Sequence, residues 1–112
     1  MKPIYINGRF LSQKLTGVQR YGQEILSALD RLLGSLDLSA GATEWILVVP
    51  EGLKITLDLH HIRILPIGHS NGHLWEQTVF AHTSRDGIAL SLCNSGPLFH
   101  PRALSVIHDA VI

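Results

Sequence analysis

The sequence contains a single cysteine, no excess of charge of either sign and no long apolar run. Cys93 has no partner for an intrachain disulfide, and no second cysteine is available to complete a zinc site. The nine Lys and Arg residues balance the nine Asp and Glu residues and are scattered, whereas a nucleic-acid-binding surface needs a concentrated basic patch. The sequence therefore excludes a disulfide-stapled domain and predicts no nucleic-acid partner.

The chain also lacks the patterns of a membrane span and of a secretory signal. No stretch approaches the about 18 uninterrupted apolar residues that indicate a spanning helix. The N-terminal residues carry a charge but lack the apolar core of a signal peptide. We therefore expect a cytoplasmic protein.

Seven histidines raise the question of a metal site. His69 and His73 have the i, i+4 spacing of a helical ligand pair, but Asn71 and Gly72 interrupt a helix there. The H-E-x-x-H pattern and a further thiolate ligand are both missing. The sequence predicts no metal site.

The length of 112 residues is that of one domain, and 46% hydrophobic residues are enough for a single core. Short apolar runs bounded by Gly, Pro or polar residues predict five strands, and helical spacing predicts two helices. The expected strands are 3–7, 45–49, 62–67, 88–92 and 104–108, and the expected helices are 16–33 and 72–84. The order β-α-β-β-α-β-β indicates a Rossmann-like α/β domain, with a mostly parallel sheet and flanking helices.

The first helix is expected to use Thr16 as its N-cap and to end at Leu33, with Gly34 just beyond its end. Apolar residues at helical spacing predict its buried face, and Asp30 is expected on the opposite side. The predicted buried residues are Val18, Tyr21, Ile25, Leu29 and Leu32, widened by Ala28 and Leu33. In the second helix, Trp75 and Phe80 are expected to be packing residues rather than a sugar platform.

The turn into the first helix, Thr16-Gly17-Val18-Gln19-Arg20-Tyr21, is the strongest candidate for a ligand-binding loop. In an open parallel sheet, ligands bind at the carboxyl ends of the strands, near the switch in strand order. A helix N-terminus offers free backbone N–H groups and a partial positive charge to a phosphate. Gly17 would let a ligand approach the backbone, and Arg20 would add a charge one turn further. The alternative is that Thr16 only caps the helix and Gly17 only eases the turn.

Several segments together resemble the glycosyltransferases of family 4, which have the GT-B fold. The segments are Ile6-Asn7-Gly8-Arg9-Phe10, Leu15-Thr16-Gly17-Val18-Gln19-Arg20-Tyr21, Leu74-Trp75-Glu76-Gln77, Leu92-Cys93-Asn94-Ser95-Gly96-Pro97 and Val106-Ile107-His108-Asp109. The resemblance covers essentially the whole chain. It implies that residues 1–112 form a single, C-terminally truncated acceptor-side domain, the incomplete N-terminal half of a GT-B fold with strand order 3-2-1-4-5.

The resemblance also implies an activity, the retaining transfer of a sugar from a nucleotide-sugar donor to a glycan or lipid-linked acceptor. Mannose transfer in polysaccharide biosynthesis is the family-level expectation. The loop that reaches the donor diphosphate corresponds to Thr16, Gly17, Val18, Gln19 and Arg20. No cofactor is expected, because the nucleotide-sugar is a substrate, and GT-B enzymes generally need no bound metal.

Further candidates follow the fourth and fifth strands. The family places a histidine after such a strand, beside the donor sugar, so His108 is expected to polarise the sugar and Asp109 to orient His108 or contact substrate. Asn94 and Gly96 are expected to line the cleft, with a tight turn as the alternative.

The apolar end of the chain at Ile112 leads us to expect more fold beyond it, namely the C-terminal donor-binding domain. Peripheral contact with the inner face of the membrane stays open, because the acceptor would be lipid-linked in part of the family. The rival function is a non-catalytic α/β module that binds a small phosphorylated ligand through the same loop. A third is a purely structural or interaction domain.

Overall fold

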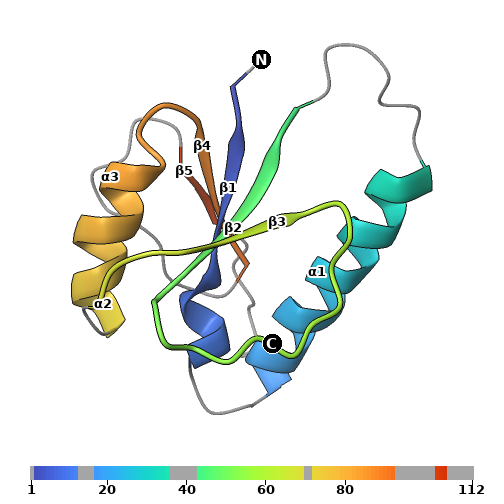
Figure 1. Cartoon of the computed structure of the whole chain (residues 1–112), viewed down its shortest axis with the longest axis horizontal. Coiled ribbons are helices and arrows are strands. Elements are labelled where there is room, and N and C mark those ends of the chain that lie inside the picture. The colour runs from blue at the N-terminus through green and yellow to red at the C-terminus, as the bar shows by residue number, and fades with distance from the viewer. Residues whose placement is uncertain (1, 13–16, 36–42, 70–71, 93–102, 106–112) are drawn as a thin grey trace, which may run out of the picture.

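Five parallel strands form the centre of the structure, a computed structural model that describes residues 2–12, 17–35, 43–69, 72–92 and 103–105 (Figure 1). The strands are β1 (Ile4–Asn7), β2 (Trp45–Val49), β3 (Arg63–Pro66), β4 (Ile88–Ser91) and β5 (Ala103–Ser105). Their order in the sheet is β3-β2-β1-β4-β5, and every neighbouring pair is parallel. The predicted Rossmann-like α/β class, the parallel sheet and the strand order 3-2-1-4-5 are therefore confirmed.

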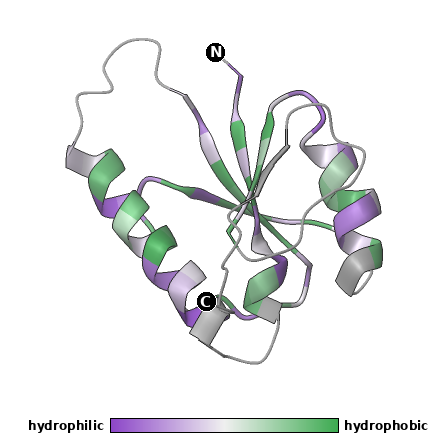
Figure 2. Cartoon of the chain, turned by 180° about the vertical axis from the view of Figure 1, so that it is seen from behind, coloured by the Kyte–Doolittle hydropathy of each residue, from purple (hydrophilic) through white to green (hydrophobic). Residues whose placement is uncertain are grey.

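Helices cover both faces of the sheet (Figure 1). The helix α1 (Gly17–Ser35) lies on one face, over an apolar cluster that includes Ile6, Leu26 and Leu47. The helical segment α2 (Gly72–Trp75), η2 (Glu76–Phe80) and α3 (Ala81–Thr83) lies on the other face, over a cluster that includes Tyr5 and Val48. Because both faces are covered, the central strands are apolar on both sides, and Figure 2 shows them mostly in the hydrophobic colour.

The predicted buried face of α1 was partly wrong. Tyr21 is 43% exposed and Leu32 is 54% exposed, and Ala28 also faces solvent. The buried positions are Gly22, Leu26 and Asp30, together with Leu33, which was predicted correctly. The buried Asp30, which the sequence placed on the solvent side, explains the difference, because its carboxylate is held by backbone N–H groups from another segment of the chain.

The end of α1 also differs from the prediction. The helix continues through Gly34 to Ser35, so Gly34 lies in the last turn rather than beyond it. A Cβ at Gly34 would come within 2.5 Å of Nε2 of His61. Gly34 therefore does not end the helix, and the atoms nearest to it belong to an exposed side chain that can move aside.

The connection from β2 to β3 is an extended segment rather than a helix. From Leu53 to Leu59, which we call the strap, half-buried leucine and isoleucine residues alternate with exposed polar residues. The half-buried residues pack against the same core as α1. The strap ends where the N–H groups of His60, His61 and Ile62 donate to the carboxylate of Asp30, at 2.8–3.1 Å.

The predicted packing role of the aromatic residues on the second helical segment is confirmed. Trp75 and Phe80 are fully buried and stacked, with ring centroids 5.8 Å apart. The indole Nε1–H of Trp75 donates to the carbonyl oxygen of Ile67, at 2.8 Å. The predicted single helix 72–84 contains a π-helical turn at Glu76–Phe80, which the sequence pattern did not indicate.

The chain leaves β1 through a 3-10 turn, η1 (Gly8–Ser12). At its first residue, Gly8, a Cβ would overlap the carbonyl oxygen of Val48 and the side chain of Val49. Glycine at this position lets the turn pass close over the carboxyl end of β2. Gly8 therefore sets the direction in which the chain leaves β1.

We expect Gly8→Ala to lower the free energy of unfolding by about 2 kcal/mol, because overpacking against backbone forces a local shift. Gly34→Ala is the matched control, since the exposed His61 side chain can move aside and alanine favours the helix by up to about 1 kcal/mol over glycine. Urea unfolding of the two variants measures both effects. Equal stability of the Gly8 variant and the original chain would contradict the role given to Gly8.

Candidate functional site

The switch in strand order lies between β1 and β4. From β1 the chain proceeds to β2 and β3 on one side, and then crosses to β4 and β5 on the other. In parallel α/β sheets, the connections that leave the two central strands diverge at this point and form a crevice at the carboxyl edge. The carboxyl ends of β1 and β4 are therefore the first place to look for a site.

Polar residues end the strands on this half of the edge. Ile6 pairs with Leu90, and the next residues along the two strands are Asn7 and Ser91. Ser91 in turn pairs with Ser105 of β5. On the other side of β1, Asn7 pairs with the apolar Val48 of β2. The change from apolar to polar residues thus occurs at the switch point and on the β4 side of it.

Asn7 is the centre of a buried hydrogen-bonded cluster. Its Nδ2 donates to Oε2 of Glu76, at 2.5 Å, and to Oγ of Ser91, at 3.2 Å. Its Oδ1 accepts from the backbone N–H of Arg9, at 3.1 Å. Asn7, Glu76 and Ser91 are each at most 4% exposed. We refer to these three side chains as the switch-point cluster.

The chemistry of the partners determines which way the amide of Asn7 faces. A backbone N–H can only donate, so the N–H of Arg9 requires the oxygen of the amide. The amide nitrogen must then face Glu76 and Ser91, both of which offer oxygen acceptors. The cluster therefore joins three elements: the turn after β1, the end of β4 and the helical segment that carries Glu76.

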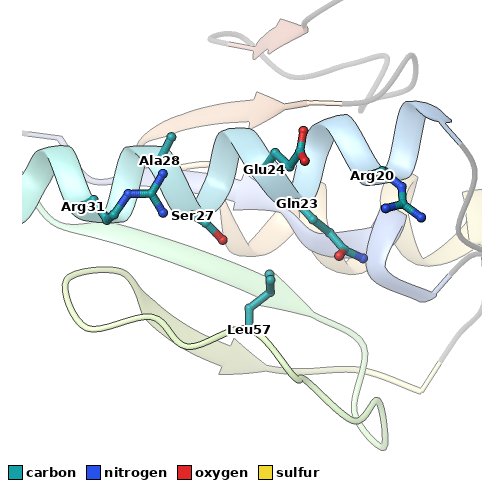
Figure 3. A pocket seen from close by; sticks show the side chains of 7 residues that line it. All are labelled: Arg20, Gln23, Glu24, Ser27, Ala28, Arg31 and Leu57. Carbon is teal, nitrogen blue, oxygen red and sulfur yellow. The ribbon is translucent and has the colours of Figure 1, made fainter.

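The predicted loop residues lie at the start of α1. Gly17, Val18, Gln19 and Arg20 form its first turn. Arg20 is exposed. Figure 3 shows Arg20 at one end of a groove between α1 and the strap, with Arg31 further along the helix and Leu57 opposite. The groove is lined by Arg20, Gln23, Glu24, Ser27, Ala28, Arg31 and Leu57.

The other predicted site residues lie outside the described residues. They are Thr16, Asn94, Gly96, His108 and Asp109. The strand that was expected to end at His108 is described over Ala103–Ser105, one residue earlier at its start. Whether these residues meet the first turn of α1 at the carboxyl edge therefore stays a prediction.

Sequence reasoning did not single out the switch-point cluster. Asn7 and Glu76 appeared only within segments that carry the family resemblance, and Ser91 appeared within an apolar run. A polar residue at the end of an apolar strand was the available signal for Asn7 and Ser91. The signal for Glu76 was a carboxylate between the apolar Trp75 and the packing residue Phe80.

Within the described ranges, no group of His, Cys, Asp and Glu side chains has the arrangement of a metal site. No helix among those residues has the length and apolar character needed to cross a membrane. Comparisons with family models, with curated proteins and with solved structures gave no match.

Proposed function

We propose that this chain is the N-terminal, acceptor-side part of a retaining glycosyltransferase with a GT-B fold. In this proposal the enzyme moves a sugar, with mannose as the first candidate, from a nucleotide-sugar donor to a glycan or lipid-linked acceptor. The donor-binding half would be a second domain encoded beyond residue 112. The observation that carries the proposal is the strand order β3-β2-β1-β4-β5, because it sets the end of β1 and its connection to α1 at the switch point.

The first turn of α1 supports a contact with the donor diphosphate. Backbone N–H groups at the start of a 19-residue helix, together with its dipole, favour a negatively charged group. Gly17 begins this turn, and the exposed Arg20 stands one turn into the helix. These residues and Thr16, Val18 and Gln19 would bind substrate in the proposed enzyme.

The carboxyl ends of β4 and β5 would supply the remaining groups. Asn94 and Gly96 follow the end of β4 by a few residues, and they would line the cleft beside the acceptor. His108 and Asp109 follow β5, and His108 would donate a hydrogen bond to a donor hydroxyl while Asp109 orients it.

Titration of the chain with UDP, GDP and their sugar conjugates, followed by amide chemical shifts and calorimetry, tests the proposal. We expect binding that shifts the amides of Gly17, Val18 and Gln19. Gly17→Leu should weaken this binding by about tenfold or more, because a side chain there keeps the phosphate from the backbone. Ser35→Leu is the control, since Ser35 is exposed at the opposite end of the same helix.

Two outcomes decide between the proposal and its rival. Binding of simple phosphorylated ligands without preference for nucleotides, and no second domain in the reading frame after codon 112, would favour a non-catalytic binding module. The proposal is wrong if Gly17→Leu leaves nucleotide binding intact and the longest product of the reading frame neither transfers nor hydrolyses any nucleotide-sugar.

A further inference from the structure

Glu76 is a fully buried carboxylate on the helical segment that packs against the sheet. The adjacent Trp75 and the nearby Phe80 are also fully buried, and both pack on the sheet with Val48 and Ala89. Burial of a charged or polar side chain opposes folding unless hydrogen bonds compensate for lost hydration. An apolar side chain of similar size would serve the packing at this position equally well. The carboxylate therefore needs an explanation other than packing.

The contact of Glu76 with Asn7 links Glu76 to the carboxyl ends of β1 and β4, where a ligand crevice is expected. Oε2 of Glu76 accepts from Nδ2 of Asn7, which also donates to Ser91. The oxygen of the same amide holds the N–H of Arg9, two residues into the connection that leads to α1. Through the side-chain amide of Asn7, Glu76 therefore influences the chain segments that follow β1 and β4.

The backbone around Glu76 gives a second, independent observation. Glu76 is the first residue of the π-helical turn η2, inside a helical segment that is otherwise α-helical. Single π turns within α-helices are rare and occur frequently at functional sites. The side chain and the backbone therefore single out the same residue.

We propose that Glu76 is a positioning residue, which fixes the Asn7 amide and thereby sets the connections that leave β1 and β4 at the ligand crevice. The inference rests on the proposed function for its ligand, a nucleoside diphosphate at the first turn of α1. Glu76 itself is fully buried and acts through Asn7. Its effect on the ligand comes from the course of the chain after Arg9 and after Ser91.

Glu76→Met, which keeps the volume and removes the acceptor, is the first test. Hydrogen exchange of the Arg9 amide should accelerate by about tenfold, because Nδ2 of Asn7 loses its carboxylate acceptor and keeps only Ser91, so the amide that accepts from Arg9 is held less firmly. The affinity for GDP and UDP should fall by about tenfold for the same reason. Glu76→Gln keeps an acceptor oxygen toward Asn7, so we expect both quantities to stay within about threefold of the original chain. Thr78→Ala, exposed on the same turn, should change neither.

The outcomes separate this inference from the proposed function. If the original chain binds neither nucleotide, the proposed function fails and Arg9 exchange alone decides about Glu76. The inference is overturned if the Arg9 amide keeps its protection from hydrogen exchange in Glu76→Met. Where the original chain binds nucleotide, it is also overturned if Glu76→Met accelerates this exchange but leaves the affinity for nucleotide unchanged. If Glu76→Met does not fold, Asn7→Ala replaces it, and the inference fails if that variant binds nucleotide as the original chain does. If the original chain binds no nucleotide, the Arg9 amide is compared in Glu76→Gln and Asn7→Ala. Equal loss of its protection in the two variants would overturn the inference about Glu76.

Discussion

Asn7→Asp is expected to lower the free energy of unfolding at neutral pH by about 3–5 kcal/mol, the cost of leaving a buried charge uncompensated. The substitution replaces the donor Nδ2 by an oxygen that faces Oε2 of Glu76 across 2.5 Å. Two buried carboxylates at this distance repel each other, and the hydrogen bond between them is lost. Urea unfolding followed by circular dichroism measures the effect.

The double variant Asn7→Asp with Glu76→Gln is expected to recover at least about 2 kcal/mol of this loss, a coupling that two directly contacting residues can show. In the double variant the direction of the hydrogen bond is reversed. The side-chain amide introduced on the helical segment donates to the carboxylate introduced on β1, Ser91 can donate its hydroxyl hydrogen, and the N–H of Arg9 still has an oxygen acceptor. Glu76→Gln alone should cost no more than about 1 kcal/mol, because an acceptor oxygen remains.

Glu24→Gln is the matched control for the second substitution, since Glu24 is exposed on α1. The double variant Asn7→Asp with Glu24→Gln should recover none of the free energy of unfolding that Asn7→Asp loses. If the single Asn7 variant does not fold, folding of the double variant is itself the result we expect. Equal stability of the single and double variants would contradict the cluster geometry.

Asp30→Asn is expected to lower the free energy of unfolding by about 3 kcal/mol near pH 6, since hydrogen bonds to a charged group contribute about 1.5–3 kcal/mol each. Both carboxylate oxygens of Asp30 accept from the N–H of His60, and Oδ1 also accepts from His61 and Ile62. An asparagine offers only one oxygen to these donors, and its NH2 group would face the N–H of His60. The loss should release the end of the strap from α1.

The stabilisation by Asp30 also depends on pH. Burial alone would raise the pKa of Asp30, but the three backbone N–H groups, with a contribution from His61, lower the pKa below its ordinary value of 3.8. A carboxyl whose pKa is lower in the folded than in the unfolded chain stabilises the fold above the unfolded value, and this contribution disappears as the pH falls through the folded pKa. The stability difference between the original chain and Asp30→Asn should therefore be largest near pH 6 and narrow below about pH 4.

Asp58→Asn provides the control for this pH series. Asp58 lies on the strap, and its side chain is 87% exposed beside His60. An exposed pair of this kind contributes little, so the variant should unfold like the original chain throughout the series. A pH-independent difference for Asp30→Asn would show that the hydrogen-bonded carboxylate is not the source of the stabilisation.

The strands were predictable because the signal for a buried parallel strand is local. Trp45–Val49 is a continuous β-branched and apolar run, and its predicted bounds agree with those of β2. The register and neighbours of each strand depend on the rest of the chain. The predicted strand order came from the family resemblance rather than from the pattern of apolar residues.

The errors on α1 show where local patterns fail. The spacing of apolar residues placed Leu32 in the core and Asp30 in solvent, whereas Leu32 is 54% exposed and Asp30 is buried. The strap approaches α1 from a side that the helix sequence does not reveal, and its backbone N–H groups require an acceptor. A carboxylate can therefore occupy a core-facing position that an apolar residue would otherwise take.

By itself, the sequence determined the class of the fold, the positions of most elements and the turn into α1 as the candidate ligand loop. These follow from apolar periodicity and from glycine and capping residues, whose effects act within a few neighbouring residues. Only the tertiary structure decided that Asn7, Glu76 and Ser91 form one buried cluster, because they are separated by up to 84 positions in the chain. Hydrogen bonds between such distant residues depend on how the sheet is assembled. The assembled sheet brings these three residues together at the switch point.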